Sequence, residues 1–207
     1  MPDWQPGLRA TDFNGIKPLL HPRAGARGRC CAALLQASNL WDRLMPFGAV
    51  VAGTIPLGLD WASSDIDILL HTPDLPAFIA QCPGLFAGFA GYHCHQRGAT
   101  SHVGPAVVVK LLVSHGASRN EEVEVFATCQ PTQEQYGFRH MVVEARILHV
   151  CGDGFAARVR ALKQAGLKTE PAFAQLLGIS DDPYLALNSL FDYSPQMLEH
   201  WLAARWR

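Results

Sequence analysis

No stretch of this 207-residue sequence reaches the roughly 18 apolar residues that a membrane-spanning helix needs. Residues 1–6 also lack the charged start and the apolar run of a signal peptide. We therefore expect a soluble, cytoplasmic protein with no membrane partner.

Charged residues are scarce, at 17%, and the formal net charge is −1. This balance argues against a protein that binds nucleic acid through charge alone. Hydrophobic residues make up 49%, which is enough for a buried core and excludes a disordered chain. One basic cluster, which contains no acidic residue, is either a solvated arm or a binding site for substrate phosphates. It contains Lys17, Arg23, Arg27 and Arg29.

None of the six cysteines belongs to a C-x-x-C pair, which favours reduced thiols packed as small hydrophobic groups. The one ligand-like cluster is His93-Cys94-His95. In a strand, His93 and His95 would share a face, but no second pair is spaced to complete a tetrahedral site. A zinc-binding regulator is therefore a third functional hypothesis.

Hydrophobic periodicity divides the chain near residue 130 into a mixed α/β part, 1–130, and a helical part, 131–207. The first part should have an irregular lead-in, two helices and five strands, and the second part five helices. The expected first-part helices are 27–44 and about 73–89, and the strands 47–52, 65–70, 92–96, 106–114 and 122–127, with a hairpin loop at 114–120. The expected later helices are 133–148, 155–165, 170–177, 183–191 and 195–206.

Two carboxylates, Asp65 and Asp67, should lie on one face of the strand at 65–70 because side chains alternate along a strand. Like charges at this spacing repel and raise each other's pKa. On an exposed face, water would screen them. At the mouth of a buried sheet, they are well placed to bind a divalent cation, and magnesium prefers carboxylate and phosphate oxygens.

Gly53 and Thr54 directly follow the apolar strand at 47–52. A glycine lets the backbone approach a ligand closely, and Thr54 adds a hydroxyl and a backbone N–H. Such N–H groups bind anions, especially where a helix starts. A phosphate site and a metal site are therefore expected close together.

This order of a strand, Gly53-Thr54, a short connection and Asp65-Ile66-Asp67 resembles the polymerase-β-like nucleotidyltransferases. The resemblance implies an α+β fold, with a mixed-sheet nucleotidyltransferase core and a helical C-terminal region. It also implies a third carboxylate on a later strand. Glu124 is the best match and Glu122, on the same face, is the runner-up, although the superfamily more often has aspartate here.

A closer resemblance covers most of the chain and is to a small bacterial family of unknown function that is regarded as nucleotidyltransferase-like. The matching segments are 53–58, 64–68, 124–126, Tyr136 with 139–141 and Glu144, 166–174 and 182–184.

These resemblances imply metal-dependent transfer of a nucleotidyl group from a nucleoside triphosphate to an acceptor, with release of pyrophosphate. Asp65, Asp67 and Glu124 would be catalytic and would hold Mg²⁺ or Mn²⁺. The acceptor could be a small molecule, an RNA end or a protein side chain. The alternative is a non-catalytic nucleotide-binding or interaction module, which a glutamate in the third position fits slightly better.

The nucleotide phosphates would be held by Gly53, Thr54 and Ser64, with Lys168 and Arg139 as further candidates. Lys168 could instead be a surface lysine beside a helix cap, and Arg139 an ion-paired arginine. Lys110 lies in a very apolar run and must reach an edge, pair with a carboxylate or face the ligand cleft.

Overall fold

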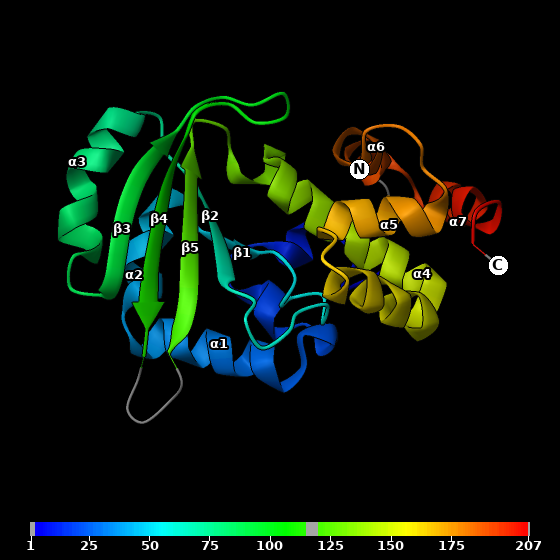
Figure 1. Cartoon of the computed structure of the whole chain (residues 1–207), viewed down its shortest axis with the longest axis horizontal. Coiled ribbons are helices and arrows are strands. Elements are labelled where there is room, and N and C mark those ends of the chain that lie inside the picture. The colour runs from blue at the N-terminus through cyan, green and yellow to red at the C-terminus, as the bar shows by residue number, and fades with distance from the viewer. Residues whose placement is uncertain (1–2, 115–119, 207) are drawn as a thin grey trace.

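The computed structural model describes residues 3–114 and 120–206, so most of the hairpin loop expected at 114–120 lies outside the described residues. Five strands form one mixed sheet in the order β1-β2-β5-β4-β3 (Figure 1). The β2–β5 pair is parallel and the other pairs are antiparallel. The strands are β1 (Val50–Ala52), β2 (Ile66–His71), β3 (Ala90–Arg97), β4 (Ala106–Val113) and β5 (Glu121–Thr128).

Helices pack on the sheet in two groups, which confirms the expected α+β class (Figure 1). The first group covers one face and consists of α1 (Gly25–Ala37), α2 (Leu40–Leu44) and α3 (Leu75–Phe86). The second group forms the helical region beside the other face. It consists of α4 (Tyr136–Gln164), α5 (Thr169–Leu177), α6 (Pro183–Ser189) and α7 (Pro195–Ala203). Within the described residues, none of these helices is long and apolar enough to cross a membrane.

Several element boundaries differ from the sequence-based prediction, and three of the differences have a local cause. The helix expected at 27–44 is split into α1 and α2 at Asn39, whose φ of 58° is a left-handed conformation that asparagine tolerates. The strand expected from residue 47 starts only at Val50, because Met45–Phe47 form a 3₁₀ turn. The helices expected at 133–148 and 155–165 run together as α4, with a break at Gly152.

The two faces of the sheet have different chemistry because side chains alternate along each strand. Ile66, Ile68 and Leu70 of β2 face a fully buried core shared with α1–α3. The intervening Asp67 and Leu69 point to the opposite face. There, Leu69 packs in a second core with the helical region, and Gly137 of α4 approaches it closely.

The lead-in before α1 is part of this second core. Its Trp4 is buried, and the indole Nε1 donates a hydrogen bond to the Tyr193 carbonyl at 3.0 Å. The Arg146 guanidinium lies over the Trp4 ring at 4.6 Å, and its Nε donates to the Leu8 carbonyl at 3.1 Å. The N-terminal segment therefore joins the C-terminal helices.

Arg27 of the basic cluster joins α1 to two other segments of the chain through hydrogen bonds. Its Nη1 donates to Asp60 Oδ2 at 3.1 Å, and its Nη2 donates to the Ser64 carbonyl at 2.7 Å and to Glu121 Oε2 at 3.2 Å. These bonds tie α1 to β5 and to the connection that leads into β2. Arg27 is therefore neither solvated nor free to hold a phosphate.

Two glycine-to-alanine substitutions test the packing of α1. A Cβ at Gly28 would lie 2.4 Å from the Leu19 carbonyl oxygen, whereas a Cβ at Gly84 of α3 meets no atom within 4 Å. Each substitution gains helix propensity of about 1 kcal/mol. We expect Gly84→Ala to raise the free energy of unfolding by up to that amount, and Gly28→Ala to lower it by about 1–3 kcal/mol through overpacking. Urea denaturation measures both, and equal stability of the two variants would contradict the contact with Leu19.

Candidate functional site

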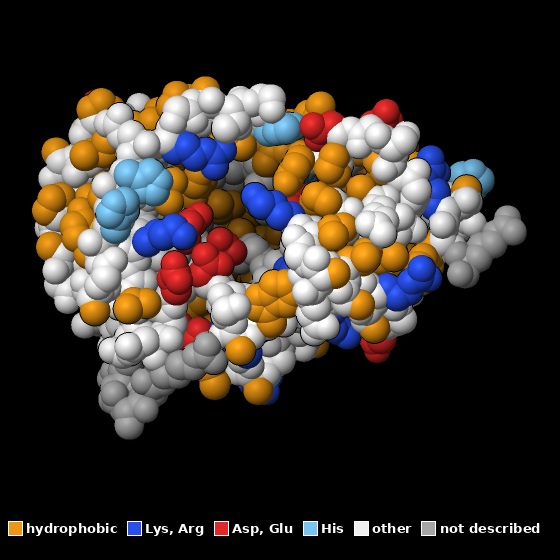
Figure 2. Space-filling model, viewed as in Figure 1, with side chains coloured by type: hydrophobic (Ala, Val, Ile, Leu, Met, Phe, Trp, Pro, Cys, Tyr) orange, Lys and Arg blue, Asp and Glu red, His pale blue; other side chains and the backbone are white. Residues whose placement is uncertain are grey.

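A row of five paired residues, four of them polar, crosses the open face of the sheet. Strand pairing places Ala52, Asp67, Glu124, Lys110 and His93 side by side, on β1, β2, β5, β4 and β3 respectively. Lys110 Nζ lies 3.0 Å from Glu124 Oε2. Figure 2 shows acidic and basic side chains gathered at the hollow between the sheet and the helical region. Ala52, Asp67 and Glu124 of this row line the cavity between the sheet and helices α4 and α5.

Gly53 brings the backbone against the Asp67 carboxylate. Its φ of 79° is in the left-handed region that favours glycine, and a Cβ there would lie 1.9 Å from Asp67 Oδ2. No other residue fits this position, because both the backbone conformation and the space require the missing side chain. The Gly53 backbone and the Asp67 carboxylate therefore lie in close contact.

Asp67 is the most strongly perturbed acid of this row. Burial, followed by the negative charges of Asp65 and Glu124, raises its pKa from 3.8 to about 7, although Lys163 and Lys110 act in the opposite direction. The three carboxylates therefore form a region of negative charge that lacks sufficient positive charge. Oxygen ligands of this kind fit a hard divalent cation.

The three carboxylates are neighbours but do not converge. Asp65 precedes the first residue of β2, and Asp67 and Glu124 are paired on adjacent strands. Across residues 3–114 and 120–206, no group of three or more His, Cys, Asp or Glu side chains is arranged to hold a metal ion. Metal binding by this set therefore stays a prediction.

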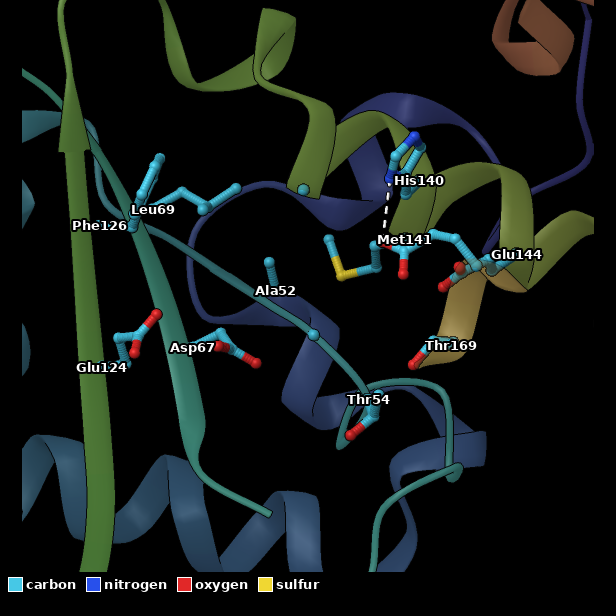
Figure 3. A pocket seen from close by; sticks show the side chains of 13 residues that line it. Ala52, Thr54, Asp67, Leu69, Glu124, Phe126, His140, Met141, Glu144 and Thr169 are labelled. Carbon is cyan, nitrogen blue, oxygen red and sulfur yellow. Dashed lines mark hydrogen bonds and ion pairs between the residues drawn. The ribbon is translucent and has the colours of Figure 1, made fainter. Parts of the chain in front are cut away.

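A cavity of about 260 Å³ lies between the open sheet face and the helices α4 and α5 (Figure 3). Its sheet side is lined by Ala52, Gly53, Thr54, Asp67, Leu69, Glu124 and Phe126. Its helical side is lined by Gly137, His140, Met141 and Glu144 of α4 and by Thr169 and Glu170 of α5. Four of the predicted phosphate and metal residues, Gly53, Thr54, Asp67 and Glu124, therefore line this cavity from the sheet side, whereas Asp65 is not part of its lining.

The helical wall carries an ordered set of hydrogen bonds. The His140 Nε2–H donates to the Tyr184 carbonyl at 2.9 Å, and its Nδ1 lies 3.1 Å from Glu170 Oε1. The bond and the charge of His140 lower the pKa of Glu170, against the effect of burial, which alone would raise it. Lys163, which is 6% exposed, donates to Thr169 Oγ1 at 3.1 Å, and burial lowers its pKa.

Sequence reasoning did not assign His140, Glu144, Thr169 and Glu170 to the site. Two signals were available. Glu144 interrupts the apolar run 141–145, and an ionisable residue on a buried helix face needs a reason. All four residues also fall in segments that match the family of unknown function, although the packing of α5 beside α4 could not be predicted from that match.

Three residues predicted to bind phosphate lie outside the cavity lining. The Ser64 hydroxyl accepts a bond from the Trp61 backbone N–H at 3.1 Å. Arg139 pairs with Asp192 at 3.3 Å and lies over the Phe191 ring at 4.4 Å. Lys168 is the N-cap residue of α5, next to cavity-lining Thr169.

The structure also separates the two candidates for the third carboxylate. Glu124 is in register with Asp67 and lines the cavity, whereas Glu122 does not line it and lies 3.6 Å from Lys110. At the far end of the row, the rings of His93 and His95 are 5.3 Å apart on β3. Cys94 lies between them in the strand and is partly buried in the core on the opposite face, so the three potential zinc ligands do not share one face.

Comparisons with known proteins identify one family model and several solved structures of low sequence identity. A family model described as Domain of unknown function (DUF4269) matches residues 33–190. No curated protein matches the chain.

Among solved structures, the chain is similar to a variant of Cid1 poly(U) polymerase bound to MgATP, with 12% identity, a TM-score of 0.47 and coverage of 76% of this chain and 47% of that chain. It is also similar to Cid1 in complex with its short product ApU, with 12% identity, a TM-score of 0.49 and coverage of 87% and 53%. A cytoplasmic RNA terminal U-transferase matches with 14% identity, a TM-score of 0.45 and coverage of 77% and 45%. The chain spans about half the length of these proteins, and such weak similarity carries no inference about activity.

Replacing Asp67 by asparagine should change how stability depends on pH. The carboxyl has a pKa of about 7 when folded and about 3.8 when unfolded, so the folded state keeps its proton longer. Between these values the stability of the wild type should fall as pH rises, by at most about 1.4 kcal/mol per pH unit from this group. Asp67→Asn removes this loss and should be more stable than the wild type at pH 8 but not at pH 4.

Thermal unfolding between pH 4 and pH 8 measures this difference. The matched control is Asp181→Asn, which changes an exposed aspartate outside the cavity and should follow the wild-type profile. If Asp67→Asn also follows the wild-type profile, the raised pKa of Asp67 is wrong.

Proposed function

The chain belongs to the family described as Domain of unknown function (DUF4269), and we propose that it transfers a nucleotidyl group from a nucleoside triphosphate to an acceptor. The observation that carries this proposal is the close approach of the Gly53 backbone to the Asp67 carboxylate, with Glu124 on the adjacent parallel strand. A phosphate-binding turn and a set of carboxylates beside one cavity match what a metal-bound triphosphate requires.

Each residue of this wall has a proposed role. The backbone of Gly53 and Thr54 would bind the β- and γ-phosphates, and Asp65, Asp67 and Glu124 would hold Mg²⁺ or Mn²⁺. The raised pKa of Asp67 supports this assignment, because a bound cation would stabilise the ionised carboxylate against the burial and the repulsion that raise it. When bound, the cation supplies charge neutralisation for the phosphates and alignment of the attacking and leaving oxygens.

The proposed reaction is a single displacement at the α-phosphorus. The acceptor oxygen forms a bond to the α-phosphorus, the bond from that phosphorus to the bridging oxygen breaks, and pyrophosphate leaves with the electron pair. The acceptor proton passes to Glu124, which faces the cavity from β5. Lys110 contacts the same carboxylate at 3.0 Å and orients it from the neighbouring strand.

Lys168, Ser64 and Arg139 are the remaining phosphate contacts proposed from the sequence. They differ in whether their side chains would have to leave a present partner to bind a phosphate. Lys168 stands next to the cavity wall and can extend toward a triphosphate. Ser64 and Arg139 would each have to leave the present partners of their side chains, Trp61 and Asp192 respectively. Lys168 is therefore the better supported of the three.

A non-catalytic nucleotide-binding module is the second candidate, and the Lys110–Glu124 ion pair favours it. The Lys110 ammonium offsets the charge of the third carboxylate, which would weaken the attraction of this residue for a cation. The acceptor in the first case, whether a small molecule, an RNA end or a protein side chain, is to be found by assay.

Asp65→Asn and Asp67→Asn should each lower turnover by about 100-fold or more, the scale for loss of one catalytic group, without unfolding the protein. The measurement is transfer of α-labelled phosphate and release of pyrophosphate with a panel of acceptors, and Asp181→Asn is the control. Normal turnover by Asp67→Asn would refute the mechanism. Binding of a triphosphate by the wild type with no pyrophosphate release from any acceptor would favour the non-catalytic module.

A further inference from the structure

The α4 wall of the cavity carries a buried carboxyl group with one unpaired oxygen. Glu144 is 4% exposed and lies on the face of α4 that lines the cavity (Figure 3). Its Oε1 atom is buried and has no hydrogen-bond partner among the described residues. A buried polar atom of this kind is costly, and most have a partner in native proteins.

Two side chains of this wall are hydrogen-bonded to groups other than Glu144. The His140 ring bonds the Tyr184 carbonyl and faces Glu170, and the Lys163 ammonium donates one bond to Thr169. Glu144 Oε1 receives no hydrogen bond from the described residues. When Glu144 is ionised, an N–H or O–H donor of a ligand can supply that bond.

A nucleotide whose phosphates bind at Gly53 and Thr54 can place its base beside Glu144, because all three residues line the same cavity.

We propose that Glu144 recognises guanine, and that the preferred substrate of the proposed transfer is a guanine nucleoside triphosphate. This inference rests on the proposed function and adds the identity of the base. Guanine presents two adjacent donors, the ring N1–H and the 2-amino group, which match the two oxygens of a carboxylate. Adenine and cytosine place an acceptor beside their amino group, and uracil has one N–H between two carbonyl groups.

A change in the protonation of Glu144 gives a second observable sign of guanine binding. In the ligand-free protein, burial and then the charge of Glu170 raise its pKa well above the ordinary value, although Lys163 acts in the opposite direction. Two donated hydrogen bonds favour the ionised form. Guanine binding should therefore release a proton from Glu144. The other titratable groups on the cavity walls are His140, Glu170, Asp67 and Glu124.

The test is calorimetry of the full chain with the magnesium complexes of GTP, ATP, CTP and UTP, and with inosine triphosphate, which lacks only the 2-amino group. We expect GTP to bind about tenfold or more tightly than the others, the scale of a bidentate base contact. Glu144→Gln replaces one acceptor by a donor, and Glu144→Met removes both oxygens. In each variant the preference for GTP over inosine triphosphate should disappear.

Proton release is measured by repeating the titration in buffers of different ionisation enthalpy. GTP should release more protons from the wild type than from Glu144→Gln, while Asp67 and the cation contribute equally to both. Melting temperatures show that the variants are folded, and Glu199→Gln, on the exposed side of α7, is the control that should keep the GTP preference.

The outcomes separate the two proposals. Equal binding of all triphosphates by the wild type, or a GTP preference that persists in Glu144→Gln and Glu144→Met, would overturn the role of Glu144 and leave the proposed function standing. Binding of none of the triphosphates by the folded wild type would overturn the proposed function and this inference with it.

Discussion

The site depends on the contact between the backbone of Gly53 and the carboxylate of Asp67. That contact requires the chain to leave β1 with a positive φ and to fold back toward β2 within a short connection. Both halves of the molecule hold this connection. Arg27 of α1 binds its end at Ser64, and Arg160 of α4 donates to the Gly58 carbonyl at 3.0 Å. A change in the packing of either half would therefore move the turn relative to the carboxylates.

Much of the sheet and its chemistry could be predicted from local sequence patterns. Alternation along 122–127 correctly indicated that Glu122 and Glu124 share a face, and the Asp65–Asp67 spacing indicated a strand beginning there. The choice between the two glutamates could not be made in this way. It depends on the parallel register that places Asp67 beside Glu124, and register is a property of two strands that are far apart in sequence.

Local sequence patterns could not predict all the residues of the helical wall of the cavity. Periodicity predicts that α4 is buried, but not which groups face it, so Glu144 could be found only as an acid in an apolar segment. Arg139 illustrates the converse. Its residue type suits phosphate, yet its nearest acid, Asp192, comes from a later helical turn, and only tertiary packing brings the two together.

The sheet side and the α4 side of the cavity have one feature in common, since each carries a buried acid with a raised pKa and too little compensating charge or hydrogen bonding. Neither acid can be explained by packing, because apolar residues would fill the same space at lower cost. A ligand that brings positive charge to Asp67 and hydrogen-bond donors to Glu144 would remove both penalties together. Because it binds only the folded chain, such a ligand would also stabilise the protein as its concentration rises above the dissociation constant. The instability of the ligand-free site is therefore itself a reason to look for one ligand that contacts both walls.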